Sequence, residues 1–205
     1  MPAWYGLAAA GVVPPTAAAV VFLLGPSAPG GASDVAESYD VLPLTSFVGR
    51  EFEPAVSPDG SRVAFIWDGG GDAFDVYVKT IGSEDVLNLT DSPADERYPV
   101  WSADGRSVLF TRSDGNGLAV MRVSALGGGV TRVFGDEAAT EIRGMSLSPD
   151  GARIAYAGRE NAASPYRIFV ATLDKGEKRA VSNPEPGSLG DIDPRFSRDG
   201  QSVAF

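Results

Sequence analysis

The sequence predicts an all-β fold, a β-propeller built of four-stranded antiparallel blades, and three observations carry this prediction. The first is a four-residue phrase, Ser-x-Asp-Gly, that occurs four times, at residues 57–60, 102–105, 148–151 and 197–200. The second is its spacing, because successive copies begin 45, 46 and 49 residues apart, close to the length of a propeller blade. The third is the short apolar run that follows each copy, which is typical of a strand.

The Ser-x-Asp-Gly phrase suits a type I turn between two strands. In such a turn the aspartate accepts local hydrogen bonds and the glycine adopts the left-handed conformation. Because the four aspartates recur at one structural position, we interpret them as turn formers and not as catalytic carboxylates. The predicted turn residues are Asp59, Gly60, Asp104, Gly105, Asp150, Gly151, Asp199 and Gly200.

Four strands are predicted in each repeat. The first precedes the turn, at residues 53–56, 98–101, 144–147 and 193–196. The second is apolar on both faces and is therefore expected to be buried, at 63–67, 108–110, 154–156 and 203–205. A third and a more polar fourth strand, separated by glycines, follow at 75–79, 118–123, 166–170, 86–90, 130–133 and 179–182. The predicted blades span about 46–90, 91–134, 135–182 and, incompletely, 183–205.

The N-terminal segment carries no charge from residue 3 to residue 24. As a helix it would be about 33 Å long, enough to cross a hydrocarbon core. The alternatives are a cleaved signal segment and a soluble helix, although a signal peptide normally begins with basic residues and the first basic residue here is Arg50. We expect a single-pass membrane anchor with the propeller on the periplasmic side, or else a periplasmic protein after signal cleavage.

Residues 25–40 are rich in Gly, Pro, Ser and Ala, and this composition predicts a flexible linker. The propeller is expected over residues 41–205. Residues 41–45 match a fourth strand with no blade before it, and in a closed propeller such a strand completes the last blade.

Composition narrows the possible functions. The formal net charge of −10 argues against direct nucleic-acid binding, which requires a basic surface. The chain has no cysteine and no histidine, so it cannot supply a disulfide, a thiolate or imidazole metal ligand, or a Ser-His-Asp triad. Residues 68–75 are rich in glycine and aspartate but lack the ligand spacing of an EF-hand loop, and are interpreted as a hairpin loop. We expect no catalytic constellation, metal site or cofactor in these residues.

Paired charges precede the predicted first strands. In a propeller, the loops at this end share one face around the central channel, and loops on a rigid scaffold often carry recognition. We interpret these charges as a candidate binding face for a protein or a small polar ligand. The alternative is that they solvate the channel mouth and pair with one another. The residues are Arg50, Glu51, Asp95, Glu96, Arg97, Glu141, Arg143, Asp191 and Asp193.

The pattern Pro-x-x-Ser-Pro-Asp-Gly-x-x-Ile/Val-Ala-Phe resembles the repeat of TolB-like β-propellers, which also occurs in the propellers of prolyl-oligopeptidase-type peptidases. The resemblance covers residues 41–205 and is more specific for fold than for activity. Residues 47–60 and 75–82 resemble a bacterial subgroup in which the propeller follows one transmembrane helix, with a winged-helix DNA-binding domain or a Ser/Thr kinase upstream. Because propellers usually have four to eight blades, the chain is interpreted as a fragment of a longer protein.

The resemblance implies a non-catalytic, membrane-tethered propeller that binds a ligand or protein, as part of a bacterial signalling or transcription-regulatory protein. Two alternatives remain open: the propeller domain of a prolyl-oligopeptidase-type serine peptidase, or a TolB-type periplasmic scaffold. No Gly-x-Ser-x-Gly motif occurs in the chain. Trp67 and Trp101 are expected to pack between blades.

Overall fold

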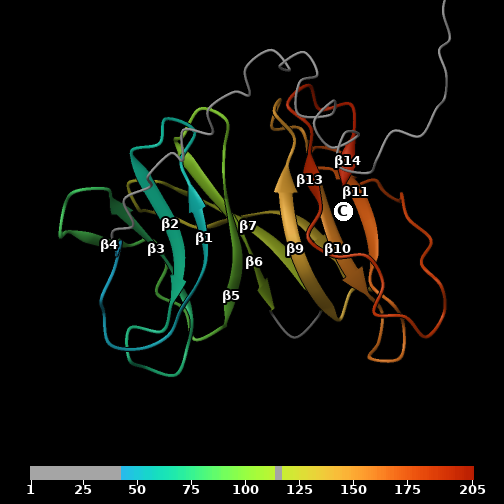
Figure 1. Cartoon of the computed structure of the whole chain (residues 1–205), viewed down its shortest axis with the longest axis horizontal. Coiled ribbons are helices and arrows are strands. Elements are labelled where there is room, and N and C mark those ends of the chain that lie inside the picture. Colours follow the sequence, from blue (N-terminus) through green and yellow to red (C-terminus); the bar gives the residue numbers. More distant parts are fainter. Residues whose placement is uncertain (1–42, 114–116) are drawn as a thin grey trace, which may run out of the picture. The chain divides into compact units, whose positions relative to one another are not determined.

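The computed structural model describes residues 43–113 and 117–205 and folds them into antiparallel sheets without a helix (Figure 1). The first sheet contains β1 (Glu51–Val56), β2 (Arg62–Trp67), β3 (Asp75–Thr80) and β4 (Val86–Asn88). The second contains β5 (Glu96–Trp101), β6 (Ser107–Ser113), β7 (Leu118–Ser124) and β8 (Thr131–Asp136). The third contains β9 (Glu141–Leu147), β10 (Arg153–Arg159), β11 (Arg167–Thr172) and β12 (Lys178–Ala180). Two short strands follow, β13 (Arg195–Phe196) and β14 (Val203–Ala204).

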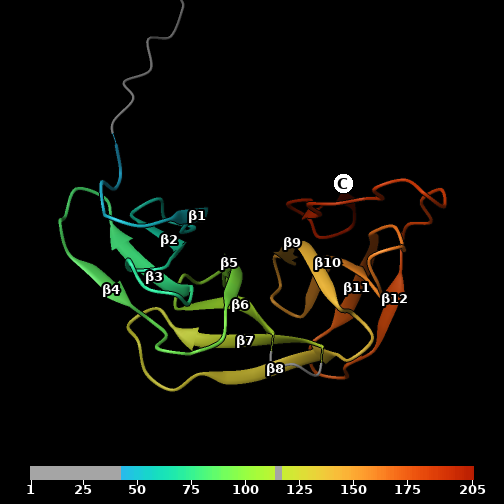
Figure 2. The ribbon, with the colours of Figure 1, turned by 90° about the horizontal axis from the view of Figure 1, so that it is seen from below.

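Each four-stranded sheet is a simple meander in which sequence neighbours pair side by side. The predicted all-β fold of four-stranded antiparallel units is therefore confirmed. In Figure 2 the first strands β1, β5 and β9 lie on the inner side of their sheets, and the last strands β4, β8 and β12 lie on the outer side. We refer to the three sheets as blades, and to β13 and β14 as the fourth unit.

Apolar side chains of the second strands form the core between successive blades. Because side chains alternate across a strand, Phe110 of β6 packs with the first blade, whereas its neighbour Leu109 packs with the third. Both side chains are fully buried, and each such burial contributes roughly 1.5–3 kcal/mol. The core therefore continues from blade to blade.

The two tryptophans differ in their packing. Trp101 lies between the first and second blades as predicted, and its Nε1 donates a 2.8 Å hydrogen bond to the Ala55 carbonyl. Trp67 stacks on Phe47 and packs at a tilted angle against Tyr77, with ring centroids 4.9 Å apart in both pairs. Because side chains alternate along β2, Trp67 points away from the second blade, to a face that no other blade covers in the described residues, so its predicted packing between blades stays a prediction.

The predicted turns are confirmed in all four repeats. In the first, Asp59 Oδ1 accepts hydrogen bonds from the Ser57 hydroxyl at 2.6 Å and from the Ser61 amide at 3.1 Å. The glycines that follow the four aspartates all have φ between 66° and 73°, a region that side-chain-bearing residues rarely adopt. The repeated phrase is therefore a structural device.

Some predicted elements differ from the structure or lie outside its described part. Residues 43–45 of the strand predicted over 41–45 form no strand, because the blade that this strand would complete is not among the described residues. In the fourth unit, β14 has only two residues and Phe205 is 57% exposed, not buried, because no further strand covers it in the described residues. No helix in residues 43–113 and 117–205 is long and apolar enough to cross a membrane. The membrane segment predicted over 3–24 and the linker over 25–40 lie outside the described residues.

Candidate functional site

The charged residues predicted to form a binding face gather where the first strands begin. Glu51, Glu96 and Glu141 are the first residues of β1, β5 and β9. Several residues that we predicted in loops therefore belong to the first strands. We call this end of the blades the front face, and the end with the Ser-x-Asp-Gly turns the turn face.

Glu96 is buried inside the front face and does not face solvent. Its side chain is fully buried, and it accepts hydrogen bonds from Thr90 and from Arg112, whose Nε lies 3.0 Å away. Burial raises the pKa of Glu96, although the hydrogen bonds from Thr90 and Arg112 partly oppose this. The assignment of Glu96 to a binding surface is therefore corrected: its carboxylate joins β5 to β6 and to the end of the first blade.

The third blade repeats this cross-strand ion pair closer to the surface. Arg159 of β10 donates from Nε to Glu141 at 2.9 Å, and the two residues face each other in the ladder. The pKa of Glu141 is lowered, first by a hydrogen bond with the Tyr166 hydroxyl and then by Arg159. Glu141 is therefore held as an anion by its own blade.

The first blade has the same arrangement with the charges exchanged. Arg50 Nε lies 2.8 Å from Asp68 Oδ2, and the Arg50 amide donates to Asp68 Oδ1 at 3.0 Å. The hydrogen bond from the Arg50 amide is the main cause that lowers the pKa of Asp68 to about 2. Glu51 accepts a hydrogen bond from the Thr45 hydroxyl.

Many of the predicted charges thus pair, but largely with residues outside the predicted binding face. The partners are Asp68, Arg112 and Arg159, which lie at the ends of second strands or directly after them. These partners could have been found from the antiparallel register, because the start of a first strand faces the end of the second strand.

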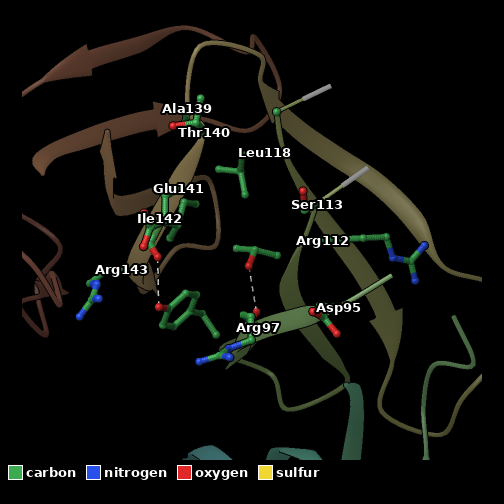
Figure 3. Close-up of a pocket in the computed structure, with 13 residues that line it drawn as sticks. Asp95, Arg97, Arg112, Ser113, Leu118, Ala139, Thr140, Glu141, Ile142 and Arg143 are labelled. Atoms are coloured by element: carbon green, nitrogen blue, oxygen red, sulfur yellow. Dashed lines mark hydrogen bonds between the residues drawn. The ribbon is translucent and has the colours of Figure 1, made fainter. Parts of the chain in front are cut away.

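A pocket of about 420 Å³ lies on the front face between the second and third blades. Its floor contains the buried side chains Leu118, Ala139 and Ile142. In Figure 3 the guanidinium groups of Arg97 and Arg143 lie on one side of the pocket, with Asp95 and Arg112 on the other. The structure therefore brings together four predicted residues at its rim: Asp95, Arg97, Glu141 and Arg143.

Arg143 differs from the other two arginines of the pocket, Arg97 and Arg112, which each pair with a glutamate. It is exposed and forms no ion pair within the described residues. Its guanidinium lies 5.6 Å from the centroid of the Tyr166 ring, and its Nε is 3.4 Å from the Tyr166 hydroxyl. Asp95, across the pocket, is also exposed and accepts a hydrogen bond from the Phe74 amide at 3.2 Å.

The last two predicted residues lie elsewhere. The Asp191 amide donates to the Tyr166 carbonyl at 2.9 Å and so attaches the fourth unit to the third blade. Asp193 lines a second groove, of about 570 Å³, along the inner strands β1, β5 and β9. Neither residue lines the pocket between the second and third blades.

The same inner strands contain a feature that the sequence analysis missed. Glu53, Tyr98 and Asp193 have φ of 53°, 55° and 52°, and Gly144 has φ of 84°. These residues are four positions before the serine of each turn. Side-chain-bearing residues pay about 1–2 kcal/mol for this conformation. The sequence did contain one indication of this left-handed backbone: Gly144 is a glycine at a position where the other three repeats have larger residues.

Comparison with known proteins agrees with this architecture. Residues 37–205 match the PD40 family, described as the TolB beta propeller domain. The "Uncharacterized peptidase YuxL" of Bacillus subtilis is 31% identical over 167 residues, which are 80% of this chain and 23% of that protein. The Tol-Pal system protein TolB of Francisella tularensis is 32% identical over 115 residues, 54% of this chain and 24% of TolB. The chain thus spans about a quarter of the length of these relatives.

Solved structures with the same fold include the crystal structure of TolB from Acinetobacter baumannii. It aligns with a TM-score of 0.63 and 28% identity, over 78% of this chain and 38% of that one. A crystal structure of puromycin hydrolase aligns with a TM-score of 0.56 over 75% of this chain and 25% of that one. Its identity is 16%, so this likeness concerns the fold alone.

Proposed function

Because the chain belongs to the TolB β-propeller family, we propose that it acts as a non-catalytic binding module whose protein partner docks on the front face. The observation that carries this proposal is the pocket between the second and third blades, with its apolar floor and the exposed Arg143 at its rim. Such a combination of an apolar cavity and a few convergent polar groups is typical of binding sites. It suits a partner that presents an apolar side chain beside a carboxylate.

The turn face offers less to a partner. Its four repeated aspartates use their Oδ1 atoms for hydrogen bonds within their own turns. A carboxylate already engaged in this way gains little from a new ligand. The absence of histidine and cysteine from the 205 residues further favours binding over catalysis by this segment.

A site-specific photo-cross-linking experiment tests the docking face. A photoreactive residue replaces Arg143 on the front face or, as the matched control, Asp104 on the turn face, in the intact protein in its source cells. Both residues are exposed and charged. The proposal expects a discrete protein adduct from position 143 and none from position 104. Adducts from position 104 alone would contradict it.

We further propose that residues 3–24 tether the propeller to the membrane and place it on the extracytoplasmic side, where it senses a ligand for a signalling protein. The uncharged run of 22 residues supports this arrangement. Alkaline phosphatase fused after residue 40 should be active, and the fusion should resist extraction from membranes by carbonate. An active but extractable fusion would support a periplasmic scaffold of TolB type after signal cleavage, whereas an inactive fusion would contradict both.

The second candidate is the propeller of a serine peptidase. It is favoured by the identity to the Bacillus subtilis peptidase, which extends over 80% of this chain. On this alternative the front face would contact peptides on their way to a catalytic domain outside these residues. Labelling of the intact protein by a fluorophosphonate probe, together with peptide hydrolysis, would support this candidate over the first.

A further inference from the structure

The turn-face sequence alternates between two versions along the chain. Residues 57–62 and 148–153 read Ser-Pro-Asp-Gly-x-Arg, whereas residues 102–107 and 197–202 read Ser-x-Asp-Gly-x-Ser. The arginines of the first version are Arg62 and Arg153, and the serines at the same position are Ser107 and Ser202. The repeat therefore has a period of two blades at this position.

The two arginines fasten their own blade to the next. Arg62 donates from Nη2 to the Gly105 carbonyl at 2.7 Å, and its guanidinium lies 4.7 Å from the Trp101 ring centroid. A guanidinium over an indole ring is attracted by the negative charge on the ring face. Together these contacts connect the turn of the first blade to the turn and inner strand of the second.

Arg153 repeats this arrangement between the third blade and the fourth unit. It donates from Nη2 to the Gly200 carbonyl at 3.0 Å and lies 5.5 Å from the Phe196 ring centroid. The aromatic partner therefore alternates together with the arginine, because Phe196 is the last residue of its first strand, as Trp101 is.

The joint between the second and third blades lacks both partners. Ser107 stands in place of the arginine, and Leu147 ends β9 in place of the aromatic residue. A serine is too short to span to the next turn. Along the inner strands of this joint, the hydrogen bond found in the described residues is the one from the Tyr98 hydroxyl to the Ile142 carbonyl, at 3.1 Å.

The outer end of the same joint is firmly held. Asp136, the last residue of β8, is buried and accepts a hydrogen bond from the Tyr156 hydroxyl at 2.6 Å. It also accepts one from the Lys178 ammonium group. Apolar contacts fill the space between, and they are non-directional, so they permit small displacements. The joint is thus fixed at one end and weakly tied at the other.

We propose that the chain bends at the joint between the second and third blades, with the Asp136 network as the pivot, while the two flanking pairs of units each move as one body. Because the 420 Å³ pocket lies across this joint, bending changes its width. A molecule that fits one width selects that conformation. The bending itself does not depend on the proposed partner and can be measured without it.

Distances between spin labels test the proposal in the intact protein, and these 205 residues have no cysteine to replace. Cysteines at the exposed positions Ile81, Leu126 and Lys175 place labels near the turn face, where the backbone at 81, 125 and 173 bonds to the turn residues 61, 106 and 152. The 81–126 pair spans the joint with Arg62, and the 126–175 pair spans the joint with Ser107.

Wild-type protein should show a broader distance distribution for the 126–175 pair than for the 81–126 pair. Ser107→Arg combined with Leu147→Trp should narrow the former, because it installs the missing contact. Arg62→Ser should broaden the latter, and this variant keeps the test decisive if the double variant does not fold. Equal widths in wild-type protein, or an unchanged 81–126 distribution in R62S, would overturn the proposal.

Discussion

Arg97 of the second blade reaches back to Glu53 of the first, with its Nη2 2.7 Å and its Nε 2.9 Å from Glu53 Oε1. The other oxygen of Glu53 accepts a hydrogen bond from the Tyr98 amide. Glu53 reaches both groups from a left-handed backbone with φ of 53°. One carboxylate thus joins two blades from a conformation that glutamate adopts only at a cost.

Glycine should be tolerated better than alanine at position 53, the reverse of their usual order. Both E53A and E53G lose the hydrogen bonds to Arg97 and Tyr98, but only alanine retains the left-handed strain of about 1 kcal/mol. We expect E53A to lower the free energy of unfolding by about 2 kcal/mol and E53G by about half as much. Urea denaturation measures both, and equal losses would contradict the strain argument.

Gly144 should be irreplaceable by alanine for a different reason, its close approach to Asp193. A Cβ at position 144 would lie 2.7 Å from Asp193 Cα, whereas a Cβ at Gly82 meets nothing within 4 Å. Both glycines have φ of 84°, so the backbone strain is matched. We expect G82A to cost about 1 kcal/mol and G144A at least 1 kcal/mol more, since the fourth unit must shift. Similar losses in thermal or urea unfolding would contradict the packing argument.

The buried carboxylate of Glu96 should make the fold less stable as the pH rises. Its pKa in the folded state is raised above the ordinary value of 4.5, so the folded protein binds this proton more tightly than the unfolded chain does. The stability that this group contributes is therefore present below pH 4.5 and is lost as the pH rises through the folded-state pKa.

The variant E96Q should lack this component of the pH dependence. The exposed Glu84 provides the control variant E84Q. We expect the unfolding free energy of wild type relative to E96Q to fall with pH above about 4.5. A difference that does not change with pH would show that Glu96 keeps its ordinary titration.

The turn aspartates should have the opposite effect and make the fold more stable as the pH rises. The hydrogen bond from the Ser57 hydroxyl is the main cause that lowers the pKa of Asp59 to about 2 from 3.8. This group therefore contributes stability above pH 3.8, and that stability is lost as the pH falls towards 2. D59N should show a shallower loss of stability over this range than wild type, and the exposed loop variant D72N should follow wild type. Acid titration of the circular dichroism signal distinguishes them.

Periodicity was enough to predict the blades. The turns at 57–60, 102–105, 148–151 and 197–200 were located correctly because glycine and aspartate report local backbone conformation directly. Strand ends were less accurate: β1 begins at Glu51 and not at residue 53, and β6 continues to Ser113 and not residue 110. Polar residues at strand ends are held by ladder hydrogen bonds, which apolar patterning does not reveal.

The candidate site was only partly predictable. The sequence identified Arg97, Glu141 and Arg143, but not that Arg112 and Arg159 neutralise their neighbours, because ion pairing depends on the register between two strands. It also placed Glu96 on the surface, since a charged residue is rarely fully buried without a partner and the partner was unknown. The pocket itself arises from packing between two blades, which no local pattern encodes.

Binding affinity is the decisive test of whether a partner docks on the front face through Arg143. We would measure the binding of the intact protein to the protein that cross-links at position 143, using wild type, R143E and D104N. We expect about tenfold weaker binding by R143E, equivalent to about 1.4 kcal/mol, and unchanged binding by D104N. Unchanged binding by R143E, or an equal loss in D104N, would contradict such docking.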